Sequence, residues 1–338
     1  MKGNYVGEDN CIDFVIAWVD DTDTEWLTQR NKYSGKNPED LADYRYRDWG
    51  TLKYFFRWVE KFTPWVNNVF FVTCGHYPSW LNLDHPKLKF IKHEDYIPKE
   101  YLPTFNAYTI ELNFHKIKEL SEHFVYFNDD MFITSYMKKS DFFDSGLPKQ
   151  IAGLEAIATN NEIYAHTLLN DVLLINRNVH YNEMIKENRI KWFYPGYGIK
   201  NLLKTIFLKN YPYLVWFNIP HLPNPILKST MERLWSDEYE ILSNSSKTKF
   251  RTEWDVNQYV FSWYDIARWN FVPGNSSIGH CFTIKGNNYK KLIDSIINQK
   301  YNMICINDTE HTFNFEKIKS KVIEAFEKIL PNKSEFEK

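Results

Sequence analysis

Residues 124–130 read Phe-Val-Tyr-Phe-Asn-Asp-Asp, an apolar run that stops on an amide and two carboxylates. Four consecutive apolar residues, all aromatic or β-branched, predict a buried β-strand. Open α/β sheets bind their ligands just beyond the carboxyl ends of such strands. At that place Asp129 and Asp130 could hold a divalent metal ion or share a proton. The alternative is that Asn128 and Asp129 only form a turn.

Other apolar runs in the first half of the chain resemble this strand in length and composition. They lie at residues 12–19, 69–73 and 88–91. The first of them ends in Asp20 and Asp21, so an acidic loop again follows an apolar strand. Helical patterns separate the strands, and this alternation predicts an α/β fold with a Rossmann-like, mostly parallel sheet flanked by helices.

The two helical patterns carry polar residues of interest. Apolar residues three and four apart predict a helix over residues 48–62, which Asp48 could cap. Arg47 immediately precedes this start, where backbone N–H groups favour anions. A second helix is predicted over residues 104–120, and it would place Glu111 and His115 four residues apart on one face.

The patterns after residue 150 are mainly helical, and we expect the chain to divide into a Rossmann-like part, a largely helical insertion and a return to the core. These parts comprise residues 1–150, 151–270 and 271–338. In the last part, the apolar residues 302–306 predict a strand that ends in Asn307 and Asp308. A charged amphipathic helix is expected to begin near Phe315.

Two features of the insertion stand out. Residues 186–217 contain six Lys or Arg against one Glu, interleaved with aromatic residues. This segment is expected to form either a helical lid packed on the sheet or an amphipathic surface that lies on anionic lipid. His221 follows Pro220 and precedes Pro223 and Pro225, so it is held more firmly than a surface loop requires.

Composition excludes several classes of protein. The 338 residues include 41 Lys plus Arg and 43 Asp plus Glu, for a formal charge of −2, so a nucleic-acid partner is not expected. The N-terminus lacks a signal pattern and the chain lacks a membrane span, so we expect a soluble cytoplasmic protein. The four cysteines have no CxxC spacing, which argues against a disulfide framework or a zinc site.

Several segments, in chain order, resemble the Stealth family. Those proteins are bacterial sugar-phosphate transferases of capsular and surface polysaccharides, together with the catalytic subunit of the lysosomal-enzyme N-acetylglucosamine-1-phosphotransferase. The first two family blocks correspond to residues 11–20 and 45–143, the third to residues 221–255 and the fourth to residues 305–308. The family often has Val-Asp-Gly where this chain has Val19-Asp20-Asp21, so the loop after the first strand departs from the family pattern. The segments that carry the resemblance are Ile12 to Asp20, Arg45 to Tyr54, Pro64 to Val66, Pro78 to Asn82, Leu102 to Asn106 and Tyr126 to Asp130.

The resemblance implies a GT-A-like nucleotide-sugar-binding fold and transfer of a hexose 1-phosphate, commonly N-acetylated, from a UDP-sugar to an acceptor hydroxyl, with release of UMP. One alternative is a GT-A glycosyltransferase that moves the sugar itself and releases UDP. Another is a carbohydrate-binding protein without catalytic activity, which the 17% of aromatic residues would suit.

Under this resemblance each candidate residue takes a role. Attack at phosphorus needs a base for the acceptor hydroxyl, and we assign Asp130, with His221 as the competing candidate. Arg251 and Arg47 are expected to clamp phosphate oxygens. Glu111 would orient the acceptor hydroxyl or a catalytic histidine, unless it only forms a helical ion pair with His115 or a nearby lysine. The expected donor-binding residues are Asp20, Arg47, Asp48, Lys53 and Asn106.

Two further expectations concern the cofactor and the partners. A divalent metal ion, Mg²⁺ or Mn²⁺, would neutralise the diphosphate, with Asp129 and Asp308 as candidate ligands. The acceptor would be an oligosaccharide or polysaccharide, carried on a polyprenyl lipid at the inner face of the cytoplasmic membrane. The basic aromatic stretch at residues 186–217 motivates peripheral contact with that membrane.

Overall fold

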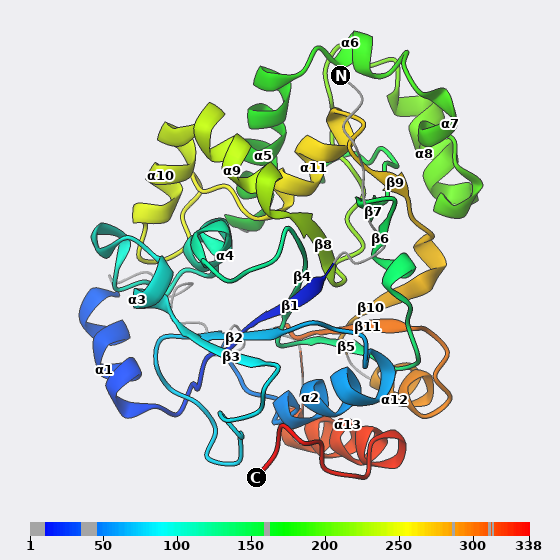
Figure 1. Ribbon diagram of the computed structural model, residues 1–338. Helices are drawn as coiled ribbons and strands as arrows, with labels where there is room; N and C mark the ends of the chain where they lie inside the picture. Colours follow the sequence, from blue (N-terminus) through cyan, green and yellow to red (C-terminus); the bar gives the residue numbers. More distant parts are fainter. Residues whose placement is uncertain (1–10, 35–45, 159–162, 286–287, 310–311, 313) are drawn as a thin grey trace.

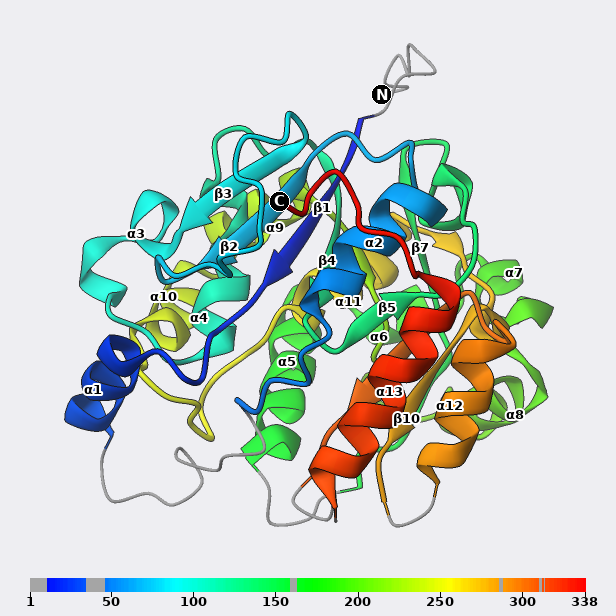
Figure 2. The ribbon, with the colours of Figure 1, turned by 90° about the horizontal axis from the view of Figure 1, so that it is seen from below.

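The computed structural model describes residues 11–34, 46–158, 163–285, 288–309, 312 and 314–338. Figures 1 and 2 show a central sheet with helices on both faces and a smaller sheet beside it. The elements up to residue 150 are β1 (Ile12–Ala17), α1 (Thr24–Tyr33), α2 (Leu52–Phe62), β2 (Val69–Thr73), β3 (Leu88–Lys92), α3 (His93–Tyr96), α4 (Ala107–Leu112), β4 (His123–Asn128), β5 (Met131–Ile133), β6 (Phe143–Asp144) and β7 (Leu147–Gln150).

The remaining elements include most of the helices. They are α5 (Ile163–Asn178), α6 (Tyr181–Met184), α7 (Arg189–Trp192), α8 (Ile199–Leu208), β8 (Asn224–Leu227), α9 (Lys228–Asp237), α10 (Tyr239–Lys247), α11 (Tyr259–Ala267), β9 (Val272–Pro273), β10 (Gly279–Thr283), α12 (Tyr289–Ile297), β11 (Met303–Asn307) and α13 (Phe315–Ile329). Single 3₁₀ turns link several of them.

The central sheet has the strand order β3-β2-β1-β4-β8. The first four strands are parallel, whereas β8 runs antiparallel to β4. The chain leaves β1 towards β2 and β3 and then returns to β4 on the other side of β1. This reversal of direction is the place where open α/β sheets bind ligands. The predicted Rossmann-like, mostly parallel sheet is therefore confirmed.

Both faces of the sheet are buried, because successive residues of a strand point to opposite sides. Phe14 and Ile16 of β1 belong to one apolar cluster, which α2 and α13 cover. Val15 belongs to the other cluster, which α5, α9 and α11 cover. Figure 2 shows α2, α12 and α13 together on the first face. Near-continuous apolar strands are expected for a sheet covered on both sides.

The second sheet has the order β10-β11-β5, with β10 and β11 parallel and β5 antiparallel to β11. The backbone N–H of Ile306 donates to the carbonyl of Asp130 (2.9 Å), which joins β11 to the end of β4. This sheet therefore brings the second predicted Asn-Asp strand end, Asn307 and Asp308, beside the first.

The sequence predictions for several helices need correction. The helix predicted over residues 104–120 is wrong: α4 ends at Leu112, and a separate 3₁₀ turn follows at Phe114–Lys116. Helix α4 ends before Asn113, whose side chain donates to the Thr109 carbonyl and to the Ser246 hydroxyl. Asp48 does not cap α2, since the residue before the first turn is Thr51 and it makes no capping bond. The terminal helix near Phe315 is confirmed as α13.

Candidate active site

The candidate site lies where β1 and β4 end side by side, with Ala17 of β1 directly opposite Asn128 of β4. Asp20 and Asp21 follow the first strand, and Asp129 and Asp130 follow the second. The parallel pairing brings the two predicted acidic loops to one edge of the sheet. The turn lies at Asp129 and Asp130, because Asn128 is still the last residue of β4, and it leads directly into β5.

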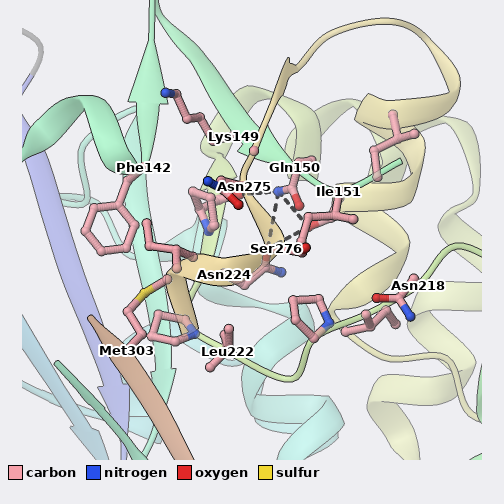
Figure 3. A pocket seen from close by; sticks show the side chains of 18 of the residues that line it. Phe142, Lys149, Gln150, Ile151, Asn218, Leu222, Asn224, Asn275, Ser276 and Met303 are labelled. Carbon is pink, nitrogen blue, oxygen red and sulfur yellow. Dashed lines mark hydrogen bonds between the residues drawn. The ribbon is translucent and has the colours of Figure 1, made fainter. Parts of the chain in front are cut away.

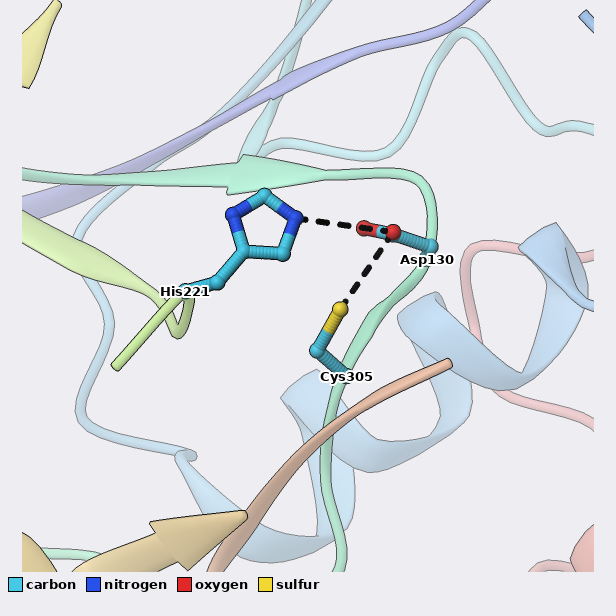
Figure 4. A group of neighbouring side chains, drawn as sticks. All are labelled: Asp130, His221 and Cys305. Carbon is cyan, nitrogen blue, oxygen red and sulfur yellow. Dashed lines mark hydrogen bonds and ion pairs between the residues drawn. The ribbon is translucent and has the colours of Figure 1, made fainter. Parts of the chain in front are cut away.

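Asp130 lies between two side chains, the thiol of Cys305 and the imidazole of His221, as Figure 4 shows. Its Oδ2 atom is 3.3 Å from the Cys305 thiol, which donates to it, and 3.9 Å from Nε2 of His221. Its Oδ1 atom is buried and has no hydrogen-bond partner within the described structure. Burial raises the pKa of Asp130, although the positive form of His221 opposes the effect. The carboxylate is thus a stronger base than an ordinary Asp, and one of its oxygens is left unpaired.

The His221 side chain is held from behind by Tyr259, whose hydroxyl is 2.8 Å from Nδ1. The His221 backbone has φ of 46°, the left-handed region that non-glycine residues rarely adopt. Such a conformation persists only where surrounding structure enforces it, and it is common at functional sites. Nε2 is therefore the ring nitrogen that faces Asp130.

Glu111 and Arg251 form a second group of ionisable side chains, in addition to Asp130 and His221. The Glu111 side chain is buried and accepts a hydrogen bond from the Tyr126 hydroxyl (3.1 Å). Burial raises the pKa of Glu111 to about 7, and the positive charge of Arg251 limits the rise. The Arg251 guanidinium lies 4.6 Å from the ring centroid of Tyr108. The alternative considered for Glu111, an ion pair with His115, is not found among the described residues, where the His115 ring packs on Trp235.

Two asparagines, at the start of α4 and on α5, hold the loop that carries Arg251. Nδ2 of Asn106 donates to Thr248 and Asp255 (2.9 Å each), and the Asn106 side chain is fully buried. Nδ2 of Asn170 on α5 donates to the carbonyls of Glu253 and Asp255. Asn106 therefore positions the loop, and the donor contact expected for it stays a prediction.

Arg47 and Asp308 are paired with each other. Nε and Nη2 of Arg47 donate to both carboxylate oxygens of Asp308 at 2.7–2.9 Å. The Arg47 guanidinium also lies 4.2 Å from the ring centroid of Phe315. A guanidinium matches a carboxylate in this two-point geometry. In this structure each side chain thus satisfies the other, and the roles of Asp308 as a metal ligand and of Arg47 in phosphate and donor binding stay predictions.

The remaining predicted residues lie along the same edge. Asp20 accepts from the N–H and hydroxyl of Thr22, which closes the turn after β1. Asp48 accepts from the backbone N–H of Gly50 (2.8 Å), and its own N–H points at Asp21. Lys53 lies in the first turn of α2, with its ammonium 4.9 Å from the ring centroid of Tyr54. Donor binding by Asp20, Asp48 and Lys53 stays a prediction.

The donor set allows a test of the expected divalent metal. Among the described residues, Asp130, His221 and Cys305 form the only group of three or more His, Cys, Asp or Glu residues whose ligand atoms all lie within 4.8 Å of one another. Their mixed oxygen, nitrogen and sulfur set suits a softer transition metal, not Mg²⁺. Asp129 fits Mg²⁺ or Mn²⁺ better, because it is exposed to solvent and lies near Asp48 and Asp21.

The charges around Asp129 support this fit. Although its side chain is accessible, the enclosing protein and the charges of Asp130 and Asp48 raise the pKa of Asp129. Burial, Asp48 and Asp20 likewise raise the pKa of Asp21. A hard cation relieves such repulsion, and Mg²⁺ needs only one or two carboxylates beside water and phosphate oxygens. The residues present therefore fit a divalent cation at Asp129.

A small cavity lies beside the His221 loop, as Figure 3 shows. Its volume is about 80 Å³, and Leu222, Asn224, Gln150 and Met303 are among its lining residues. Ligand pockets measure about 300–1,000 Å³, so this space admits only a few water molecules. His221 is not part of its lining, and we assign the cavity no ligand.

Three residues of the site were missed from the sequence: Tyr259, Cys305 and Asp21. Tyr259 begins an aromatic helix, α11, that resembles ordinary core. Cys305 belongs to the apolar run of β11, and its isolation from other cysteines argued against a role. Asp21 stands where the family often has glycine, and an acidic residue directly after a strand was a usable signal.

Comparison with known proteins agrees with this arrangement. The family model "Stealth protein CR1, conserved region 1" matches residues 12–38, and "Stealth protein CR2, conserved region 2" matches residues 45–151. Together they cover both acidic strand ends and the helix between them.

Full-length relatives carry the comparison across the rest of the chain. The capsular polysaccharide phosphotransferase WcwK of Streptococcus pneumoniae is 41% identical over 332 residues, covering 97% of this chain and 99% of the relative. The receptor polysaccharide phosphotransferase WefC of Streptococcus gordonii is 38% identical, covering 96% and 98%. The exopolysaccharide phosphotransferase cps2G of Lactiplantibacillus plantarum is 37% identical, covering 97% and 96%. The resemblance noted in the sequence is confirmed, and the chain belongs to the Stealth family of phosphotransferases.

Proposed function

We propose that this protein transfers a hexose or N-acetylhexosamine 1-phosphate from a UDP-sugar to a hydroxyl of an acceptor sugar. The reaction forms a phosphodiester in a bacterial capsular or surface polysaccharide and releases UMP. The activities named for its relatives support phosphate transfer in polysaccharide synthesis. The observation that carries the proposal is the Asp130 carboxylate, whose Oδ1 atom is unpaired and whose Oδ2 atom lies 3.9 Å from Nε2 of His221, at the point where the strand order reverses.

The distance between Asp130 and His221 suits an acceptor hydroxyl. The 3.9 Å from Oδ2 to Nε2 is too long for a direct hydrogen bond. An acceptor oxygen beside both side chains lies within hydrogen-bond reach of each. Asp130 takes the hydroxyl proton, because burial makes its carboxylate more basic. His221 then positions the same oxygen, with Tyr259 holding its ring.

The bond changes occur at the β-phosphorus of the donor. The acceptor oxygen forms a bond to that phosphorus, the bond from phosphorus to the bridging oxygen breaks, and UMP leaves with the bridging oxygen. The bond between the sugar and its phosphate stays intact, so the anomeric configuration is retained. Catalysis then consists of positioning and charge neutralisation. Arg251 supplies a guanidinium to the phosphoryl oxygens, and Asn106 and Asn170 hold its loop.

Asp129, with Asp48 or Asp21, would hold the divalent cation beside the diphosphate. A bound Mg²⁺ or Mn²⁺ supplies neutralisation of the phosphate charge. Asp20 and Lys53 lie along the same edge and are assigned to the nucleotide and sugar of the donor.

We also propose that the acceptor is carried on a polyprenyl lipid at the inner face of the cytoplasmic membrane. None of the helices in the described ranges is long and apolar enough to cross a bilayer. Contact with the membrane would then be peripheral.

The test uses a panel of UDP-sugars with Mg²⁺ or Mn²⁺ and measures release of UMP. Asp130→Asn keeps the shape of the side chain and removes the base, so turnover should fall by about 10²-fold or more. Asp144→Asn is the matched control, because Asp144 is exposed and lies on β6. Unchanged turnover in Asp130→Asn, with folding intact, would transfer the role of base to His221.

A further inference from the structure

Helix α8 packs Leu202 and Leu208 on the core but exposes a second set of apolar side chains to solvent. Its apolar side chains Ile199, Leu203, Ile206 and Phe207 are 78, 50, 45 and 76% exposed. These positions follow the spacing of one helix face. A surface helix normally buries that face, so the four residues need an explanation that the fold of the chain does not supply.

The opposite face of α8 explains why the helix is fixed in this orientation. The Thr205 hydroxyl is buried and accepts from the backbone N–H of Leu154 (2.9 Å). Asn201 donates to the carbonyl of Tyr197 (2.9 Å), and Lys204 pairs with Glu155. The contacts of Thr205 and Lys204, together with Leu202 and Leu208 packed on the core, hold this face of the helix against the body of the protein. Rotating the helix to bury the exposed apolar face would break the bonds of Thr205 and Lys204.

Exposed apolar surface continues on neighbouring segments. Ile190 on α7 is 86% exposed. A groove of about 600 Å³ lies at the end of α8, with Leu169, Leu173, Leu208, Tyr211, Tyr213 and Leu214 among its lining residues. Figure 1 shows α7 and α8 together at the margin of the molecule, away from the central sheet. Contiguous exposed apolar surface in a soluble domain marks a site of contact with a partner or a membrane.

The charges around this surface select its partner. Residues 186–217 contain six basic residues and one acidic residue. Lys186, Arg189 and Lys200 are exposed beside the apolar side chains. A two-fold contact between two copies would bring these like charges together and would be repelled. An anionic bilayer offers both an apolar interior for Phe207 and negative headgroups for the lysines.

We propose that the exposed apolar face of α8, with Ile190 of α7, binds the surface of an anionic phospholipid bilayer. The helix lies in the plane of the interface, and its apolar side chains enter the boundary between headgroups and acyl chains. The strand-like segment that follows α8 pairs Phe217 with Leu154 and reaches His221 four residues later. The face therefore belongs to the same insertion that supplies the catalytic histidine. The proposal gives the lipid-carried acceptor of the proposed function a place of encounter, but vesicle binding is measured without donor or acceptor.

The test is co-sedimentation of the full chain with vesicles of phosphatidylglycerol and, separately, of phosphatidylcholine. We expect binding to the anionic vesicles at low ionic strength and weaker binding at high ionic strength. The double variant Ile199→Ser/Phe207→Ser should reduce the partition coefficient by at least about tenfold, because burying one large apolar side chain already exceeds the tenfold step. Lys200→Ser should reduce it by about fivefold on anionic vesicles only.

Tyr136→Ser is the matched control, since Tyr136 is 57% exposed and lies after β5, outside this face. Its binding should equal that of the unmodified protein. Thermal unfolding of each variant shows that folding is retained.

The proposal is overturned if the unmodified protein ignores anionic vesicles, or if the double variant binds them equally well. It is also overturned if sedimentation velocity finds a dimer that Phe207→Ser converts to a monomer, because a second copy then covers the face. A failure of UMP release would leave these results unchanged, so the two proposals fail separately.

Discussion

Replacing Glu111 by Gln should raise the stability of the protein, relative to that of the unmodified protein, more at pH 8 than at pH 5. Burial raises the pKa of Glu111 from its ordinary value of 4.5 to about 7. The folded protein therefore retains a proton that the unfolded chain releases between these pH values. Stability falls as pH rises through this window, because the folded state binds more protons than the unfolded state. Glutamine stays neutral at every pH, so the variant escapes this loss.

The size of the effect follows from the pKa difference. Each unit corresponds to about 1.4 kcal/mol, so the full loss from Glu111 is roughly 3 kcal/mol, of which about 2.5 kcal/mol falls between pH 5 and pH 8. The entropy of unfolding of a 338-residue protein is about 0.7 kcal/mol/K. The Tm of Glu111→Gln minus that of the unmodified protein should therefore rise by about 3–4 °C between pH 5 and pH 8.

The assay is thermal unfolding of both proteins at pH 5 and pH 8, followed by circular dichroism. Other titrating groups contribute equally to both proteins and cancel in the difference. Glu119→Gln, on the exposed surface, controls for the chemical change. A Tm difference that is the same at the two pH values would refute the argument that Glu111 is buried with a raised pKa.

Three further predictions concern residues that position the site. Tyr259→Phe removes the hydroxyl that contacts Nδ1 of His221 and should lower the kcat of UMP release about tenfold, with KM little changed. A tenfold rise in KM with unchanged kcat would contradict the positioning role. Asn106→Ala should lower the free energy of unfolding by about 2–4 kcal/mol in urea titration, because Thr248 and Asp255 lose a buried partner. Asp308→Asn should cost about 1–3 kcal/mol in the same titration, since the Arg47 guanidinium keeps only part of its pairing.

Local patterns were sufficient for the core of the fold. The apolar runs of β1, β2 and β4 are long enough to identify as buried strands, and their order along the chain predicts a parallel sheet. The first strand ends beside β4, so two acidic loops that are far apart in the sequence meet as expected.

Tertiary contacts decided the features that the sequence did not predict. Helix α4 stops at Leu112, where the Asn113 side chain pairs with Ser246. The pairing of Arg47 with Asp308 joins residues 261 positions apart. The amphipathic pattern of α8 was visible, but which face is buried depends on Thr205 and Leu154.

The most direct test of the central claim follows the β-phosphate of the donor. The protein is incubated with acceptor and with UDP-sugar that carries a radioactive β-phosphorus. Attack at phosphorus predicts that the label enters the saccharide product, and that unlabelled UMP is released in equal amount. Label that remains in UDP, with an unlabelled glycoside as product, would contradict phosphate transfer and identify a glycosyltransferase.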